Sequence, residues 1–393
     1  MSGDAGRGVV IVGAGTAGVT AATTLRTQGY SGPVTLLGAE AGLPYRRTAL
    51  SKDLLGADLS TERIALQQPD SWRARSIDVR GGVRVVAVDP EARVVRLDDG
   101  SDLGYRALVL ATGGRPVRPP WLDAEVATLR TREDALAIRE ELHRSQRLVV
   151  IGGGLIGLEL AASAASHGLL ASVVEGTGRV ASRVMPRVVS DYLAALHVEN
   201  GVWMRIGSPA ESANARRVQL TCGKQLVGTV VAAMGAAPDT ALAESAGVRT
   251  GPAGIEVDAT LATDVDGIFA AGDAAALPDP RTGVAARGEH WFGATDQGRA
   301  VAQSVQAYLE GRPAQAFVDV PRAWTVQYGV NMQMVGWPAE AGEVQVDGSL
   351  DDRDATVTTR VGGVLVGAVT VGRRAGVAAE LRSQIAATLG STV

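Results

Sequence analysis

Two glycine triads with the same spacing are the residues of this sequence best suited to chemistry. Residues 13–18 read Gly-Ala-Gly-Thr-Ala-Gly, and residues 152–157 read Gly-Gly-Gly-Leu-Ile-Gly. In a strand–turn–helix unit, the first glycine allows a tight turn and the second lets the backbone approach a pyrophosphate. The third lets the helix pack closely on the strand, and the helix N-terminus offers N–H groups and partial positive charge to phosphates. The pattern predicts two dinucleotide sites.

Carboxylates follow both triads at the place where a ribose would lie. Glu175 comes after the second triad and can accept hydrogen bonds from the 2′- and 3′-hydroxyls. It would also repel a 2′-phosphate, because two like charges 4 Å apart cost about 4 kcal/mol at an effective dielectric of 20. Residues 176–178 supply no cation and Arg179 comes late, so NADH is predicted rather than NADPH. After the first triad, Glu40 either reaches the adenosine ribose or is a solvated loop residue.

Each triad is placed between a short apolar strand and an alanine-rich helix. Strands are predicted over residues 9–12 and 148–151, with helices ending near Gln28 and His167. A glycine follows each helix end, as C-capping favours, and a second apolar strand follows at 34–37 and 171–174. The chain therefore contains two strand–turn–helix–strand units.

A third region begins near Pro313 and has a different character. Alternating residues predict strands over 343–346, 356–361 and 364–371, and a closing helix is predicted over 376–389. Together these elements predict a small C-terminal α+β domain.

Composition narrows the possible functions. The net charge of −4 gives no reason to expect nucleic acid or an anionic membrane as partner. A lone cysteine, Cys222, is expected in the core of a strand over 217–222; one cysteine provides neither a dithiol relay nor a cysteine metal site, and no metal is expected. No apolar window approaches the roughly 18 residues that span a membrane, so a cytoplasmic protein is expected.

Further segments resemble those of a known family. They are Pro44-Tyr45-Arg46-Arg47-Thr48-Ala49-Leu50-Ser51-Lys52, Ala111-Thr112-Gly113-Gly114-Arg115-Pro116, Phe269-Ala270-Ala271-Gly272-Asp273, Glu289-His290-Trp291, Asp296-Gln297-Gly298 and Trp324-Thr325-Val326-Gln327-Tyr328. In order and spacing they resemble the oxygenase-coupled ferredoxin reductases, the FAD-dependent family that includes putidaredoxin reductase. The resemblance extends from residue 8 to about residue 337.

The resemblance implies an α/β fold with two Rossmann-like dinucleotide-binding domains, as in glutathione reductase, plus the small C-terminal α+β domain. The FAD-binding domain would comprise residues 1–112 and 240–312, the NADH-binding domain 113–239, and the C-terminal interface domain 313–393.

The resemblance also implies roles for individual residues. Lys52 would lie near the flavin N5 edge and pair with Glu159, Glu159 would orient the nicotinamide carboxamide, and Trp324 would pack on the isoalloxazine. Surface exposure for Lys52, a helix-dipole contact for Glu159 and a core position for Trp324 are the simpler alternatives. The FAD-binding candidates are Gly13, Gly15, Ala17, Gly18, Glu40, Arg47, Lys52, Val85, Ala111, Thr112, Gly113, Arg130, Gly272, Asp273, Glu289, His290 and Trp291. The NADH-binding candidates are Gly152, Gly154, Leu155, Ile156, Gly157, Glu175 and Gly235.

Hydride transfer from nicotinamide to flavin needs no acid or base, which fits a sequence without a recognisable triad. His143, His167 and His197 are given no role, whereas His290 stands where the family has a small polar residue and either tunes the flavin, donates a proton or does neither.

The family resemblance implies that the electrons pass to a [2Fe–2S] ferredoxin serving a cytochrome P450 or an oxygenase. This sequence departs from the family at Arg322, Ala323 and Val326, close to the electron exit. A self-contained NADH-dependent flavoenzyme reducing a quinone, a metabolite or dioxygen is therefore the alternative, and a flavin-binding protein with little turnover is a third reading. Either a monomer or a homodimer is compatible with the sequence.

Overall fold

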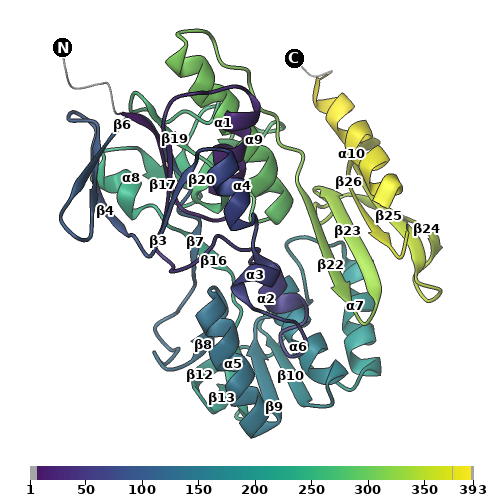
Figure 1. Ribbon diagram of the computed structural model, residues 1–393. Coiled ribbons are helices and arrows are strands. Elements are labelled where there is room, and N and C mark those ends of the chain that lie inside the picture. Colours follow the sequence, from purple (N-terminus) through teal and green to yellow (C-terminus); the bar gives the residue numbers. More distant parts are fainter. Residues whose placement is uncertain (1–6, 374, 391–393) are drawn as a thin grey trace. The chain divides into compact units, whose positions relative to one another are not determined.

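The computed structural model describes residues 7–373 and 375–390, which form two compact units whose segments can be followed by colour in Figure 1. The first unit contains the segment up to residue 46 and residues 60–115 and 237–319. The second contains residues 47–59, 116–236 and the chain from residue 320 onward.

A parallel sheet forms the centre of the first unit. Its strands lie in the order β3-β2-β1-β6, and β19 also pairs with β6. Their bounds are Gly8–Val12 for β1, Val34–Gly38 for β2, Asp78–Gly81 for β3, Asp102–Leu110 for β6 and Ile268–Ala270 for β19. Helix α1 (Thr16–Thr27) connects β1 to β2. This is the strand–turn–helix–strand unit that the first glycine triad predicts.

The remaining elements of the first unit surround this sheet. An antiparallel extension is formed by β4 (Val85–Asp89) and β5 (Val94–Leu97), and a smaller sheet by β17 (Thr250–Gly251), β18 (Gly254–Glu256), β20 (Ala275–Pro278) and β21 (Ala285–Ala286). The helices are α3 (Thr61–Ile64), α4 (Pro69–Ala74), α8 (Ala241–Ser245), the short 3-10 helix η1 (Gly272–Ala274) and α9 (Trp291–Leu309).

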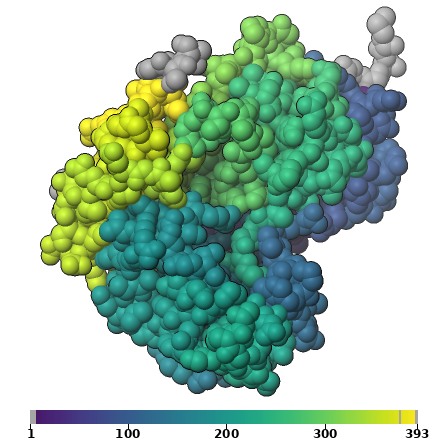
Figure 2. All heavy atoms as spheres, turned by 180° about the vertical axis from the view of Figure 1, so that it is seen from behind, coloured from purple at the N-terminus to yellow at the C-terminus, as the bar shows by residue number. Residues whose placement is uncertain are grey.

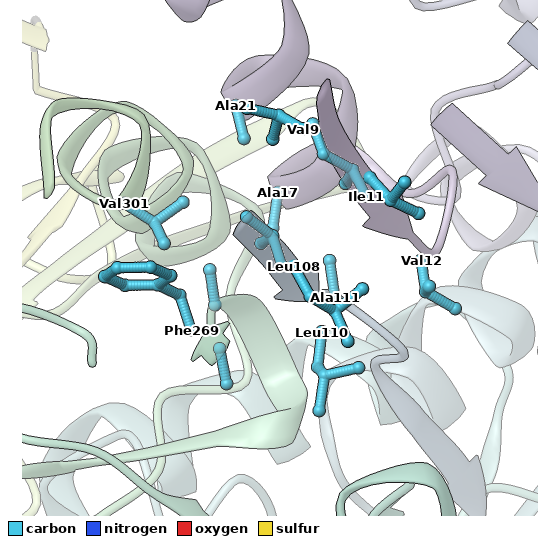
Figure 3. Packing of buried hydrophobic residues seen from close by; sticks show 14 of the residues in the cluster. Val9, Ile11, Val12, Ala17, Ala21, Leu108, Leu110, Ala111, Phe269 and Val301 are labelled. Carbon is cyan, nitrogen blue, oxygen red and sulfur yellow. The ribbon is translucent and has the colours of Figure 1, made fainter. Parts of the chain in front are cut away.

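Small residues let α1 and α9 approach each other closely. A Cβ atom on Gly298 of α9 would lie 2.6 Å from the carbonyl oxygen of Ala17 on α1, so only glycine fits there. Beneath these helices, Leu108 and Phe269 of the sheet form part of a continuous apolar core (Figure 3). Burial of this core is the main stabilising contribution to the unit.

The second unit repeats the pattern around the second triad. Its parallel sheet has the order β11-β10-β9-β15-β8, with bounds of Arg147–Ile151 for β9, Leu170–Glu175 for β10, Trp203–Ile206 for β11, Thr229–Ala232 for β15 and Ala127–Thr128 for β8. The helices are α2 (Ala49–Lys52), α5 (Arg132–Ser145), α6 (Leu155–Ser166) and α7 (Arg187–Glu199). An antiparallel sheet adds β12 (Ala210–Asn214), β13 (Arg217–Leu220) and β14 (Gln225–Val227).

The C-terminal part of this unit is an antiparallel sheet with one helix on it. The strand order is β22-β23-β26-β25-β24, with bounds of Arg322–Gln327, Val330–Gly336, Val364–Val371, Asp354–Val361 and Glu343–Ser349, respectively. Helix α10 (Ala375–Gly390) packs on β23 and β26. Figure 2 shows this yellow-green part directly beside the teal segment of the same unit, and α6 contacts β22 there. The predicted fold class is confirmed.

The chain passes from one unit to the other at five points, two of which lie in the short strands β7 (Gly114–Pro116) and β16 (Ala236–Pro238). In the part of the chain that the structure describes, no helix has the length and apolarity needed to cross a bilayer.

The expected core position of Cys222 is wrong. Strand β13 ends at Leu220, and Cys222 is exposed in the turn that follows. Gly223 has a φ of +81° and its N–H donates to the carbonyl of Leu220 at 2.9 Å, which closes the turn. The alternating residue pattern over 217–222 predicts a strand that is too long, because the pattern takes no account of the glycine that turns the chain.

Candidate functional site

The first glycine triad forms a tight loop with one open position. Gly13 has a φ of +113°, and a Cβ atom there would lie 2.0 Å from the carbonyl oxygen of Ala111. A Cβ atom on Gly18 would lie 2.0 Å from the carbonyl oxygen of Gly13. By contrast, a Cβ atom on Gly15 would have no atom within 4 Å, and Gly15 is the N-cap of α1 without a side-chain cap. The loop therefore leaves room for a phosphate at the helix N-terminus.

The second triad has the same geometry. Gly152 has a φ of +111°, and its Cβ atom would lie 2.3 Å from the carbonyl oxygen of Ala233, while that of Gly157 would lie 2.1 Å from the Gly152 carbonyl oxygen. Gly154 again faces open space and caps α6, again without help from a side chain. Leu155 and Ile156 are the first residues of α6. Both loops thus fit the pyrophosphate of a dinucleotide by the same physical test.

Glu175 is held beside the second loop. It is the last residue of β10, and its carboxylate accepts hydrogen bonds from the N–H of Gly153 at 2.7 Å and of Thr177 at 2.6 Å. Two backbone donors fix the direction in which the carboxylate points. Glu40 lies two residues beyond β2 and accepts a hydrogen bond from the hydroxyl of Tyr45, so its carboxylate is also oriented, though by a side chain.

Several FAD-binding candidates meet close to the first loop. Ala111, Thr112 and Gly113 follow β6, and the Thr112 hydroxyl donates to the carbonyl of Asp239 at 2.6 Å. Gly272 begins η1, and its Cβ atom would lie 2.9 Å from the side chain of Ala17 on α1.

Other candidates sit at the edges of nearby elements. Asp273 follows Gly272 in η1, and Val85 is buried at the start of β4. Glu289 pairs with Arg287, His290 is the N-cap of α9, and Trp291 is the first residue of that helix.

The remaining candidates belong to the second unit. The Arg47 guanidinium donates to the carbonyl oxygen of Arg130 at 2.7 Å, which brings these two together. Gly235 has a φ of +96°, and its Cβ atom would lie 3.3 Å from the guanidinium of Arg183.

Lys52, Glu159 and Trp324 form one cluster within the second unit. The Lys52 ammonium lies 2.7 Å from Glu159 Oε1 and 4.5 Å from the centre of the Trp324 ring. These distances correspond to an ion pair and a cation–π contact. Glu159 is the fifth residue of α6 rather than part of its first turn, and it is only 4% exposed, so a simple dipole contact at the helix end does not explain it.

Two residues that the sequence analysis missed complete the surroundings of Glu159. The Ser51 hydroxyl donates to Glu159 Oε2, and the Thr325 hydroxyl donates to Oε1 at 2.7 Å. A buried carboxylate needs such donors, because an unpaired buried charge is strongly destabilising. Ser51 precedes Lys52 and Thr325 follows Trp324 in the chain. This proximity to predicted site residues is the sequence signal that could have identified them.

A buried histidine extends the hydrogen bonding away from Glu159. Gln327 donates to the Thr325 hydroxyl at 3.0 Å, His197 Nε2 lies 2.7 Å from Gln327 Oε1, and the Tyr328 hydroxyl lies 3.0 Å from His197 Nδ1. Burial lowers the pKa of His197 to about 4, against a smaller opposing contribution from its bond to Gln327. Burial also raises the pKa of Tyr328 above its usual range. His197 is therefore neutral at physiological pH.

Strand β22 separates the departures from the family pattern. Ala323, Thr325 and Gln327 are buried on one face, whereas Val326 is 40% exposed on the other face together with the half-buried Arg322 and Trp324. Among the described residues, no group of three or more acidic, histidine or cysteine side chains is arranged to hold a metal ion.

Comparison with known proteins gives consistent results. Residues 7–298 match the family model described as pyridine nucleotide-disulphide oxidoreductase, and residues 322–389 match the one described as reductase C-terminal. The chain is 38% identical to the anthranilate 1,2-dioxygenase system ferredoxin–NAD(+) reductase component of Burkholderia cepacia, over 95% of this chain and 93% of that protein. It is 35% identical to the 3-phenylpropionate/cinnamic acid dioxygenase ferredoxin–NAD(+) reductase component of Photorhabdus laumondii, over 92% of each. The crystal structure of the covalent putidaredoxin reductase–putidaredoxin complex contains a chain with a TM-score of 0.89 and 33% identity, over 97% of this chain and 93% of that one.

Proposed function

Because this chain belongs to the pyridine nucleotide-disulphide oxidoreductase family, we propose that it is an FAD-dependent reductase that oxidises NADH and delivers electrons to a [2Fe–2S] ferredoxin. The ferredoxin would serve an oxygenase or a cytochrome P450. The observation that carries this proposal is the pair of glycine loops, each tight at its first and third glycine and open at its second. Two dinucleotides, one for each loop, are what a flavin–nicotinamide reductase requires.

The first loop would hold FAD and the second NADH. The FAD domain would comprise residues 1–112 and 240–312, the NADH domain 113–239, and the ferredoxin-facing domain 313–393. Beside the first loop Glu40, and beside the second Glu175, would accept hydrogen bonds from the ribose hydroxyls. Bound FAD supplies the redox chemistry, since it accepts a hydride and releases electrons singly.

Preference for NADH rests on Glu175. Its carboxylate is already aimed by the N–H groups of Gly153 and Thr177, so it is preorganised to accept ribose hydroxyls. A 2′-phosphate would be placed against this fixed negative charge. Residues 176–178 supply no cation to neutralise that phosphate, so NADPH is disfavoured.

The cluster of Lys52, Glu159 and Trp324 would orient the reacting rings. Glu159 would accept a hydrogen bond from the nicotinamide carboxamide, and Lys52 would present positive charge toward the flavin N5 edge. Trp324 would cover the isoalloxazine and exclude water. The ion pair supports this assignment because Glu159 is buried and paired while Lys52 retains 23% side-chain exposure, so the ammonium can still contact a ligand.

Transfer to a ferredoxin is supported by similarity to known proteins and by the cysteine count. Relatives that match over most of this chain are named as ferredoxin–NAD(+) reductase components, and one structural neighbour is a reductase in complex with putidaredoxin. The single cysteine, Cys222, provides no intramolecular dithiol, so electrons leave directly from the flavin. Reduction of a small molecule is the second candidate, favoured by the altered exposed face at Arg322 and Val326.

An anaerobic titration tests the proposal. Purified protein should carry FAD, and NADH should bleach its absorbance with a stoichiometry of one hydride per flavin, while NADPH should be much slower. Cytochrome c should then be reduced only when a [2Fe–2S] ferredoxin is added. A flavin that NADH does not bleach refutes the proposal. Rapid bleaching without transfer to any ferredoxin, but with turnover on a quinone, favours the second candidate.

A further inference from the structure

A continuous chain of hydrogen bonds connects Glu159 to the far end of strand β22. It runs from Glu159 through Thr325 and Gln327 to His197 and ends at Tyr328. All five residues belong to the second unit, and they join helix α6, helix α7 and β22 together with the residue that follows that strand. Thr325, Gln327 and His197 are all at most 1% exposed. Water does not compete for the bonds among these three residues, so their geometry is determined by the protein.

The chemistry of the groups fixes the direction of every bond. Glu159 is a carboxylate beside the Lys52 ammonium and only accepts, so Thr325 uses its single hydroxyl proton to donate to it. Thr325 must then accept from Gln327, which turns the amide NH₂ toward Thr325 and the amide oxygen toward His197. Facing an acceptor, His197 Nε2 carries the ring proton.

The same logic gives the role of Tyr328 at the end of the chain. Neutral His197 with its proton on Nε2 has a free lone pair on Nδ1, so Nδ1 accepts from the Tyr328 hydroxyl. Every donor therefore points toward Glu159, and reversing any one bond would leave two acceptors or two donors face to face.

This arrangement positions a group rather than moving protons. A proton relay would require Gln327 to pass a proton through its amide, and an amide at neutral pH neither gains nor loses protons readily. Protonation of His197 is also suppressed, because burial lowers its pKa to about 4. A chain of this kind instead locks the rotamers of its members.

We propose that Thr325, Gln327 and His197 are positioning residues that hold the Glu159 carboxylate in the orientation needed for hydride transfer. The inference rests on the proposed function, because it assigns Glu159 the task of orienting the nicotinamide. It adds that the C-terminal domain, which contributes Thr325 and Gln327, takes part in the NADH half-reaction and not only in contact with an electron acceptor.

The experiment is anaerobic stopped-flow reduction of the FAD-loaded protein by NADH. Thr325→Val keeps the shape of the side chain but removes the proton that reaches Glu159. We expect the limiting rate of flavin bleaching to fall by about tenfold to a hundredfold, the range associated with misplacing a reacting group by up to 1 Å. The dissociation constant for NADH should change much less, and Thr325→Ser, which retains the hydroxyl, should restore most of the rate.

Thr359→Val is the matched control. Thr359 is buried in the same domain and its hydroxyl donates to the carbonyl of Pro338 at 2.8 Å, so the same chemical change is made away from Glu159. Its limiting rate should equal that of the unmodified protein. Flavin content and the thermal unfolding midpoint of each variant report on folding.

Gln327→Glu provides a second test with a readout that loss of stability would not imitate. The new carboxylate can accept from Thr325 but not donate, so it competes with Glu159 for the Thr325 proton and the limiting rate should fall at neutral pH. When that carboxylate is protonated, a donor is restored, so its rate should recover as the pH is lowered, whereas Thr325→Val should show no recovery.

The possible results separate the two proposals. If Thr325→Val reduces its flavin as fast as the unmodified protein, loses only NADH affinity, or slows no more than Thr359→Val, the positioning role is refuted. If the unmodified protein itself is not bleached by NADH, the proposed function fails instead.

Discussion

Protonation of His197 should couple the stability of the fold to pH. In the native state its pKa is lowered from 6.5 to about 4 because the imidazole is buried, with 0% exposure. Between these two values the unfolded chain binds one more proton than the native protein, so the free energy of unfolding decreases as the pH is lowered. The contribution is complete above pH 6.5 and is lost at about 1.4 kcal/mol per pH unit within the window, or roughly 3 kcal/mol in total.

Urea unfolding at a series of pH values measures this contribution. Acidic side chains also titrate in this range, so the informative quantity is the difference in slope between the unmodified protein and His197→Gln, which lacks the imidazole. The slope of the unfolding free energy against pH should be shallower in His197→Gln by the contribution of about one proton, whatever the variant's absolute stability. His143→Gln is the matched control, because His143 is exposed on α5 and its replacement should leave the slope unchanged. Parallel lines for His197→Gln and the unmodified protein would refute the reasoning.

Two further predictions concern the second glycine loop, to which we assign NADH. Glu175→Arg removes the proposed ribose acceptor and places a cation where a 2′-phosphate would lie, so the ratio of kcat/KM for NADH to that for NADPH should fall by at least about tenfold. Glu175→Gln only removes the charge and should lower this ratio less. An unchanged ratio in Glu175→Arg contradicts the assignment. Gly154→Ala adds a Cβ atom into open space at a φ of −76°, so the thermal midpoint should stay the same while the dissociation constant for NADH rises, because the methyl group blocks the pyrophosphate; unaltered NADH affinity measured by titration would count against that site.

The sequence allowed the nucleotide-binding framework to be predicted because its constraints are local. Gly13 and Gly152 need a positive φ, and Gly18 and Gly157 need the absence of a side chain, whatever surrounds them. Such requirements appear directly as residue type and spacing. The predicted strands and helices next to the triads are confirmed for the same reason.

The hydrogen-bonded surroundings of Glu159 could not be predicted in this way. Its bonds to Ser51 and Thr325 join positions 108 and 166 residues apart, and His197 meets Gln327 across 130 residues. No spacing rule connects segments so distant, and serine, threonine and glutamine are common residues without a distinctive pattern. The prediction of a core position for Cys222 is wrong for a different reason. The alternating residue pattern continues past the strand end, where a glycine closes the turn.

The two faces of β22 have different surroundings, one buried and one partly exposed. Side chains alternate along a strand, so Thr325 and Gln327 point into the protein while Trp324 and Val326 lie on the opposite face. The departures from the family pattern at Arg322 and Val326 fall on this second face. Substitutions there change charge and shape without touching any of the bonds that reach Glu159. Alternation along β22 therefore lets the exposed face vary while the hydrogen bonds that orient the Glu159 carboxylate stay the same.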